Sequence, residues 1–285
     1  MYCRSVEPFK TEGVSEKWTV VAVPSLEDNY AYLLIDNATR KAAAFDPVEP
    51  EKMLAAAEAE GVTVETVLTT HKHWDHAGGN DEIKELVPGI RVIGSAIDDV
   101  EGCTEPVADN DVVEVGGLRL KCLIIPGHTL GSVCYYLEDD SAGAVFTGDV
   151  LFVAGCGRVF EGGMDQMWGG IESKLLPLPD QTRVFVGHEY TITNLHFSLS
   201  VDPENSELKQ MMEWSQQQLI AKGPTVPTTM EWEKAANPFM RAKAPVIMAA
   251  CGCSEPVDVS AAAPFASSCE VSKTRLHRCS RRSAR

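Results

Sequence analysis

The chain has 285 residues, which is more than one average domain of roughly 150 residues and less than two large ones. Hydrophobic residues make up 44% and charged residues 23%, which is typical of globular proteins and excludes a largely disordered chain. The formal net charge is −16 and no apolar run reaches about 18 residues, so we expect neither nucleic acid nor a membrane as a partner.

The first part of the chain alternates β-type runs with a helical pattern. Turn residues separate the runs, and an Ala- and Glu-rich stretch that ends at Gly61 indicates a helix. The predicted elements are strands at residues 18–23, 30–35, 41–45 and 66–70, and a helix at residues 51–60.

A second group of strands follows, and it is succeeded by helices. The predicted strands are residues 91–93, 111–115, 118–125, 133–137, 144–147 and 182–186, with a helix at 165–176 between the last two. Beyond Tyr190 we expect no further strand, and helices are predicted at 205–222 and 228–236. The fold class is therefore α/β. We divide the chain into a layered domain, residues 1–190, and a small helical domain, residues 191–285.

Charge and cysteine usage bear on the compartment. Residues 271–285 hold six basic residues and no acid, so the other 270 carry −22, with 19 of the basic residues and all 41 acids. The nine cysteines are odd in number and scattered, and Cys251 and Cys253 lack the second pair of a zinc ribbon. We expect reduced thiols in a monomeric cytoplasmic protein, with the mitochondrial matrix as the alternative.

Metal-type side chains crowd the segment that follows the predicted strand at 66–70. His71 and His73 are two residues apart, so in extended geometry they point to the same side and can reach one metal ion. Asp75 and His76 follow after a further bend and can serve a neighbouring ion. The chain has seven histidines, and three of them lie within six positions, which indicates a metal site.

Three more candidate ligands each stand directly after an apolar strand and a glycine. They are His128, Asp149 and His188. Sites in α/β sheets form at the carboxyl ends of strands, so these side chains are expected to join the first cluster. The pattern predicts one ion on the three histidines His71, His73 and His128, a second ion on Asp75, His76 and His188, and Asp149 as a bridge.

The donor set favours a catalytic centre over a structural one. Imidazole and carboxylate without thiolate suit two divalent ions, for which zinc is the expected metal and iron or manganese the alternatives. Two ions about 3.5–4 Å apart share a hydroxide in hydrolytic enzymes. Asp75 and Asp149 are the catalytic carboxylates of this prediction, acting as ligands rather than as acids.

The motifs carry a family resemblance. The segments His71-Lys-His73-Trp-Asp75-His76, Pro126-Gly-His128-Thr, Thr147-Gly-Asp149 and Gly187-His188 resemble those of the metallo-β-lactamase fold superfamily. Further stretches narrow the resemblance to the glyoxalase II (hydroxyacylglutathione hydrolase) family: Asp28-Asn29-Tyr30, Gly187-His-Glu-Tyr-Thr191 and Asn237-Pro-Phe-Met-Arg241. The resemblance runs from about residue 20 to residue 241.

The resemblance implies a fold and an activity. The fold is a four-layer αββα sandwich followed by a small α-helical domain that helps to hold glutathione. The activity is hydrolysis of S-D-lactoylglutathione to D-lactate and glutathione by a metal-bridging hydroxide, in methylglyoxal detoxification. Among the expected substrate contacts, Arg158 stands where the family has a basic residue and Tyr190 where it has a tyrosine.

The chain departs from the family at two places. Phe160 replaces the other substrate tyrosine, so one hydroxyl contact is missing. Pro264 and Ser267 stand where the family has a basic pair in its final helix. Two alternatives are a non-catalytic thiol- or metabolite-binding relative and an enzyme like the persulfide dioxygenases, which use one iron. The tryptophan after His73 and the segment 237–241 argue against the dioxygenase.

Overall fold

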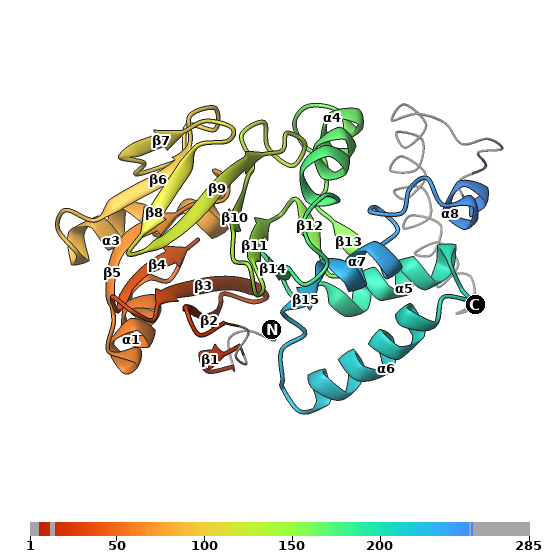
Figure 1. The fold of residues 1–285 in the computed structure, drawn as a ribbon, viewed down its shortest axis with the longest axis horizontal. Helices are drawn as coiled ribbons and strands as arrows, with labels where there is room; N and C mark the ends of the chain where they lie inside the picture. Colours follow the sequence, from red (N-terminus) through yellow and green to blue (C-terminus); the bar gives the residue numbers. More distant parts are fainter. Residues whose placement is uncertain (1–5, 12–14, 251, 253–285) are drawn as a thin grey trace, which may run out of the picture.

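Two β-sheets face each other in the middle of the molecule, and helices cover their outer faces (Figure 1). The computed structural model describes residues 6–11, 15–250 and 252. On the first sheet lie α1 (Pro50–Glu60) and α3 (Asn80–Leu86), and on the second lie α4 (Met164–Gly170) and the π-helical turn η2 (Ile171–Leu175). The predicted four-layer αββα arrangement is confirmed.

The first sheet has seven strands in chain order. They are β1 (Phe9–Lys10), β2 (Trp18–Ser25), β3 (Asn29–Asp36), β4 (Lys41–Phe45), β5 (Thr63–Leu68), β6 (Arg91–Ser95) and β7 (Glu105–Val107). Strands β1 to β4 are antiparallel, and β4 to β7 are parallel. The parallel part follows from helical crossovers such as α1, which ends at Gly61 in the left-handed conformation.

The second sheet has six strands in the order β15-β14-β11-β10-β9-β8. Their bounds are β8 (Val112–Val115), β9 (Leu118–Ile124), β10 (Val133–Leu137), β11 (Ala144–Gly148), β14 (Arg183–Val186) and β15 (Thr228–Thr229). A small separate ribbon pairs β12 (Leu151–Phe152) with β13 (Gly155–Cys156). Strands β11 and β14 are parallel, so their carboxyl ends lie next to each other.

Strand β3 is buried on both faces because it lies between the two layers of core. Tyr32 and Leu34 point into the core between the sheets, and the alternate residues Leu33 and Ile35 pack under α1. The Tyr32 ring meets Phe185 edge to face, with ring centroids 5.2 Å apart. Burial of large side chains from both sheets, at about 25 cal/mol per Å² of apolar surface, holds the layers together.

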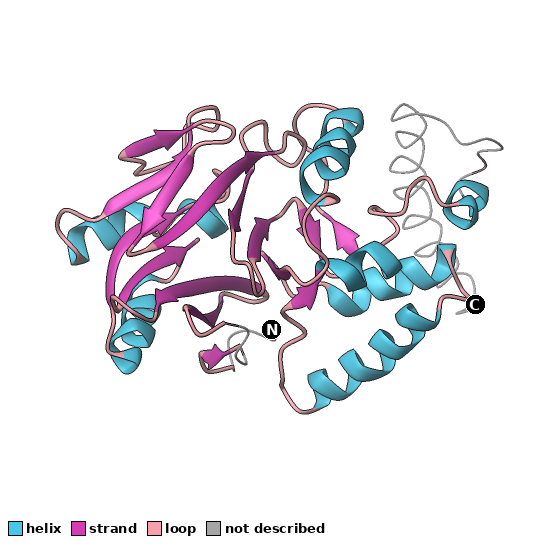
Figure 2. Ribbon diagram, viewed as in Figure 1, coloured by secondary structure: helices cyan, strands magenta, loops and turns pink. Residues whose placement is uncertain are grey.

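The last described helices form a group beside the second sheet (Figure 2). They are α5 (Thr191–Val201), α6 (Ser206–Ile220), α7 (Met230–Ala236) and α8 (Pro245–Ala250). The Asn205 side chain caps α6 by accepting from the N–H groups of Glu207 and Leu208, and Thr229 caps α7 in the same way.

The structure corrects the expectation that no strand lies beyond Tyr190. Strand β15 extends the second sheet by pairing with β14, and Met230 N–H donates to the carbonyl of Thr182 at its end. A strand of two residues has no period for a sequence pattern to reveal. The sequence pattern also did not indicate the 11-residue helix α5. The short elements that it did not indicate are β1, β7, β12, β13, α3, α8 and α2 (Trp74–Ala77).

Some sequence expectations lie outside the described residues. They concern Cys251, Cys253, Pro264, Ser267 and the basic stretch 271–285. The division into domains at residue 190 stays a prediction. Among the described helices, none combines the length and apolar character needed to cross a membrane.

A buried carboxylate joins the helical group to the second sheet. Glu233, on α7, accepts hydrogen bonds from the Ala154 N–H at 3.2 Å, from the Thr228 hydroxyl at 2.7 Å and from the Asn237 amide at 2.9 Å. Asn237 also donates to the carbonyl of Gly155 at 2.9 Å. Burial outweighs these hydrogen bonds and raises the pKa of Glu233 to about 7.

This raised pKa predicts a pH-dependent stability. An unfolded glutamate titrates near pH 4.5, so the contribution of Glu233 is full below that pH and is lost as the pH rises through about 7. In Glu233→Gln the contribution is absent. The difference in free energy of unfolding between wild type and variant should therefore shrink by about 3 kcal/mol from pH 4.5 to 7.5, measured by urea unfolding. A difference that is constant or grows with pH contradicts the assignment.

Candidate metal centre

Four strand ends deliver metal-type side chains to one edge of the sandwich. His71 and His73 lie in the loop after β5, which leads into α2, where Asp75 and His76 are found. The other three follow strands of the second sheet: His128 after β9, Asp149 after β11 and His188 after β14. Because the two sheets face each other, their strand ends bring the seven side chains into one cluster.

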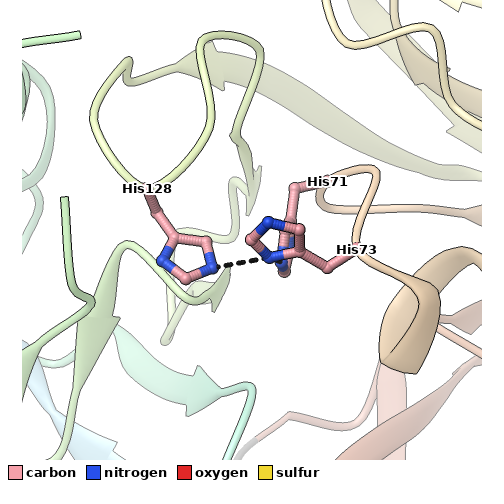
Figure 3. Close-up of side chains that lie close together, drawn as sticks. All are labelled: His71, His73 and His128. Carbon is pink, nitrogen blue, oxygen red and sulfur yellow. Dashed lines mark hydrogen bonds between the residues drawn. The ribbon is translucent and has the colours of Figure 1, made fainter. Parts of the chain in front are cut away.

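The first ligand group is His71, His73 and His128 (Figure 3). The Nδ1 atom of His73 is 3.0 Å from Nε2 of His71 and 3.0 Å from Nε2 of His128. His71 and His128 are buried, and His73 is partly exposed. Two extended residues, 71 and 73, point their rings to one place, as the spacing predicts.

The second ligand group is Asp75, His76 and His188. The Nε2 atoms of His76 and His188 are 3.2 Å apart. The Asp75 Oδ2 atom lies 3.7 Å from Nε2 of His76 and 3.5 Å from Nε2 of His188. The turn of α2 places Asp75 and His76 side by side, and the end of β14 brings His188 to them.

Asp149 lies between the two groups. Its Oδ2 atom is 3.3 Å from Nε2 of His128 and 3.4 Å from Nε2 of His188, and its Oδ1 atom is 3.4 Å from Nε2 of His76. The Oδ1 atom is buried and makes no hydrogen bond with the part of the chain that the structure describes. A carboxylate that contacts both groups is positioned to bridge two ions.

Hydrogen bonds on the far side of the rings fix the tautomers. The Nδ1–H of His128 donates to the carbonyl of Arg158, at 2.9 Å. The Nδ1–H of His76 donates to Asp46 and that of His188 to Asp28, both at 2.9 Å. In the neutral rings the proton therefore lies on Nδ1, and the Nε2 lone pairs point into the centre.

The charges of the cluster are strongly coupled. Burial alone would raise the pKa of Asp149, but His76 and His188 hold it well below its usual value. Burial opposes the charge of His188, yet Asp149 raises its pKa to about 10. Burial and the neighbouring His76 lower the pKa of His71 well below the usual value. The carboxylate thus favours positive charge on His188, while burial disfavours it on His71.

The residues fit divalent metal ions. Ring nitrogens with inward lone pairs 3.0 Å apart repel each other unless a cation lies between them. The Oδ1 atom of Asp149, which makes no hydrogen bond with the described residues, is a further atom that can bind a metal ion. Nitrogen and oxygen donors in two adjoining groups are typical of binuclear centres. The part played by each side chain as a ligand stays a proposal.

Two glycines allow this close packing. A Cβ atom on Gly187 would lie 2.4 Å from Oδ1 of Asp149. On Gly157 it would lie 1.7 Å from the carbonyl oxygen of Asp149 and 3.2 Å from Nδ1 of His128. Both glycines are needed because any larger residue would displace Asp149.

The predicted substrate residues border the cluster on two sides. The Phe160 ring meets His128 and His73 edge to face, with centroids 5.2 and 5.8 Å apart, and the Arg158 guanidinium carbon lies 5.2 Å from the centre of the Phe160 ring. The Tyr190 ring stacks on His188 at 4.8 Å and 6°. All three side chains are exposed, so a bound molecule can reach them.

Sequence reasoning did not assign the partners of the ligands. Asp46 accepts from His76, from the Thr70 N–H and from the Thr70 hydroxyl, and Asp28 accepts from His188. The available signal was an acidic residue directly after a buried strand for Asp46, and an acidic turn between two strands for Asp28. Neither signal tells which histidine the carboxylate meets, because the contacts join distant parts of the chain.

Comparisons with known proteins agree with the fold and the cluster. Residues 30–188 match the Metallo-beta-lactamase superfamily. A metallo-beta-lactamase from Staphylococcus aureus superposes with a TM-score of 0.61 at 24% identity, covering 89% of this chain and 71% of that one. ETHE1 from Myxococcus xanthus superposes with a TM-score of 0.59 at 26% identity, covering 91% and 97%. The chain belongs to the metallo-β-lactamase superfamily.

The C-terminal part and the curated relatives narrow the family. Residues 189–267 match the Hydroxyacylglutathione hydrolase C-terminus. The cytoplasmic hydroxyacylglutathione hydrolase of Arabidopsis thaliana is 48% identical over 239 residues, which cover 83% of this chain and 93% of the relative. A hydroxyacylglutathione hydrolase-like protein of Gallus gallus is 42% identical over 243 residues, covering 84% and 86%. Within the superfamily, the chain is a member of the hydroxyacylglutathione hydrolase family, as its motifs indicated.

The position of Asp149 predicts its effect on metal content. Asp149→Ala removes the carboxylate that contacts both ligand groups, so the affinity for Zn²⁺ should fall by more than about 100-fold. The measurement is the number of ions per chain after dialysis against buffered Zn²⁺. Asp139→Ala is the control, because Asp139 is bonded to Trp18 and Lys17 away from the centre. An Asp149 variant that retains two ions with wild-type affinity contradicts the bridging position.

Proposed function

We propose that the chain is a thioester hydrolase of the glyoxalase II type, which converts S-D-lactoylglutathione to D-lactate and glutathione in methylglyoxal detoxification. The observation that carries the proposal is the convergence of five histidines and two aspartates at one edge of the sandwich. The similarity to hydroxyacylglutathione hydrolases over most of the chain supports the same activity. The glutathione thioester is the substrate class that follows from this family.

The two ligand groups would hold one ion each. His71, His73 and His128 would bind the first ion, the group of Asp75, His76 and His188 would bind the second, and Asp149 would be shared. Bound divalent ions supply a nucleophilic hydroxide near neutral pH, because they lower the pKa of water from about 15.7 to about 7, and they polarise a carbonyl oxygen. Zinc is the metal that we propose, with iron and manganese tolerated by the same donors.

The chemistry requires little more from the protein. Water adds to the thioester carbonyl, a C–O bond forms, the C–S bond breaks and sulfur leaves as the glutathione thiolate. Of the two protons of the water, one is taken up when the thiolate becomes the thiol, and the other is released with the D-lactate anion. A thiol has a pKa near 8.5, so the thiolate leaves without a general acid. Asp75 and Asp149 therefore act as ligands, and their partner histidines are kept in the tautomer that points Nε2 inward.

Three residues at the border would contact the substrate. Arg158 offers a positive charge to a glutathione carboxylate, in a protein whose net charge is −16. Burial, with Asp28 and Asp149 nearby, raises the pKa of Tyr190, so its hydroxyl stays protonated and can donate a hydrogen bond. Phe160 offers an apolar ring next to His128 and lacks a hydroxyl.

The setting of the enzyme is part of the proposal. The Arabidopsis relative is named cytoplasmic, which supports a cytoplasmic location for this chain rather than a mitochondrial one. All seven proposed ligands come from a single chain, which supports action as a monomer.

Loss of thioester absorbance tests the activity. The metal-loaded protein should hydrolyse S-D-lactoylglutathione, and a chelator should abolish the reaction until Zn²⁺ is restored. Asp149→Ala should lose more than about 100-fold in kcat/KM, and Asp139→Ala should keep it. A loaded protein that binds the thioester without hydrolysing it would be a thiol-binding relative, and oxygen uptake with glutathione persulfide at one iron per chain would indicate a dioxygenase. Either result contradicts the proposal.

A second measurement tests the role of Arg158. Arg158→Ala removes the charge from the border, so KM for the anionic thioester should rise about fivefold, the effect of roughly 1 kcal/mol at an exposed ion pair, while kcat changes little. Arg119→Ala is the matched control, since Arg119 is exposed on β9 and distant from the cluster. Equal KM values for the Arg158 variant and the wild type would exclude a substrate contact.

A further inference from the structure

The turn between β2 and β3 reaches into the second ligand group. The Asp28 Oδ1 atom accepts a hydrogen bond from Nδ1 of His188 at 2.9 Å. The neighbouring Asn29 amide donates to Oδ2 of Asp75 and to its backbone carbonyl, both at 3.1 Å. Two adjacent residues of one turn thus bind two members of the same ligand group, although Asp75 and His188 lie 113 positions apart in the chain.

Backbone hydrogen bonds hold this turn against His188. The Tyr30 N–H donates to the carbonyl of Gly187 and the Glu189 N–H donates to the carbonyl of Asp28, each at 2.8 Å. Asn29 and His188 form an isolated antiparallel bridge. The turn is therefore bonded to the chain on both sides of His188, which fixes the distance between the Asp28 carboxylate and the ring.

The His188 ring has one orientation open to it. Asp28 binds its Nδ1, the Tyr190 ring stacks on it at 4.8 Å, and the Phe152 ring meets it edge to face at 5.9 Å. Nε2 is left facing the other members of the group. Without the Asp28 carboxylate, a rotation of the ring by half a turn would direct Nε2 away from them.

The two ligand groups differ in these outer partners. In the first group, Nδ1 of His128 donates to a backbone carbonyl and Nδ1 of His71 lies 3.0 Å from the Thr70 hydroxyl. In the second group, His76 and His188 each donate to a carboxylate. A carboxylate partner orients a ligating imidazole and makes it a better donor. The His76 and His188 rings of the second group are therefore oriented by charged partners, whereas the partners of His71 and His128 at these positions are uncharged.

We propose that Asp28 and Asn29 are positioning residues that set the affinity of the second ligand group for its ion, and thereby decide whether the centre holds two ions or one. Neither residue is among the proposed ligands or substrate contacts, so both act through Asp75 and His188. The inference rests on the two-ion scheme of the proposed function. It adds the residues that control the binding of the second ion.

The experiment is a titration of the full chain with Zn²⁺ at buffered free concentrations, which resolves the two binding steps. Asp28→Ala and Asn29→Ala should weaken the second step by about 10- to 100-fold and leave the first within about twofold. The affinity of Asp28→Asn for Zn²⁺ at the second step should lie between that of the two alanine variants and that of the wild type. Its amide oxygen still accepts a hydrogen bond from Nδ1 of His188 but carries no charge. The Asp28 side chain is 40% exposed, so its removal opens no closed cavity.

Asp36→Ala is the matched control. Asp36 ends the same strand β3 and binds the Thr39 hydroxyl and the Gly117 N–H, at 2.6 and 2.8 Å, away from the centre. It should destabilise the fold and leave both Zn²⁺ affinities unchanged. Equal weakening of both steps in the Asp28 and Asn29 variants, or wild-type affinity at the second step, overturns the inference.

Activity separates this inference from the proposed function. A wild-type chain that binds two ions in separate steps, with the second step weakened in the variants, supports the positioning role even if it hydrolyses no glutathione thioester. In that case the proposed substrate is wrong and the inference stands. If the wild-type chain hydrolyses the thioester but the variants change neither Zn²⁺-binding step, the proposed function stands and the inference is wrong.

Discussion

One buried carboxylate surrounded by imidazoles sets the requirement that the rest of the structure meets. Asp149 is taken out of water and placed within 3.4 Å of His76, His128 and His188. A buried charge of this kind is costly unless positive charge and hydrogen bonds compensate for it. The parallel pairing of β11 with β14 brings Asp149 to His188, and the facing sheet brings the other histidines. The sandwich thus holds the buried carboxylate next to the imidazoles. Either kind of group would lose solvation without compensation if it were buried alone.

A ring of outer contacts makes this arrangement durable. Carboxylates from two turns and one carbonyl bind the far nitrogens of His76, His188 and His128. The contact of Asp46 with His76 is buried and shielded from water and salt, whereas Asp28 is partly exposed. Each fixes a ring whose other nitrogen faces the centre. The orientation of the histidine rings therefore depends on loops of both sheets and not on the motif after β5 alone.

Much of the fold was predictable because its strands have strong periodic patterns. The bounds of β4 and β10 agree with those expected, and most other long strands differ by one to three residues. The seven clustered side chains were predictable because they follow strands that end at one edge, three of them directly after a glycine. Strand β15 and the roles of Asp28 and Asp46 were not, since they arise from pairings between residues more than 25 positions apart. The local propensity of a segment does not depend on such distant partners, so it does not predict them.

Strand β15 limits where this chain can be recombined with another protein. It belongs to the later part of the chain, yet it covers the edge of β14, the strand that leads to His188. A recombinant that joins the first 190 residues to the helices of another protein would replace this edge strand as well. If the new segment failed to pair, β14 would present open backbone groups at Arg183 and Val184, which favours association between chains. A recombinant of this kind should therefore keep Thr228 and Thr229 with the sheet and cross over within α7.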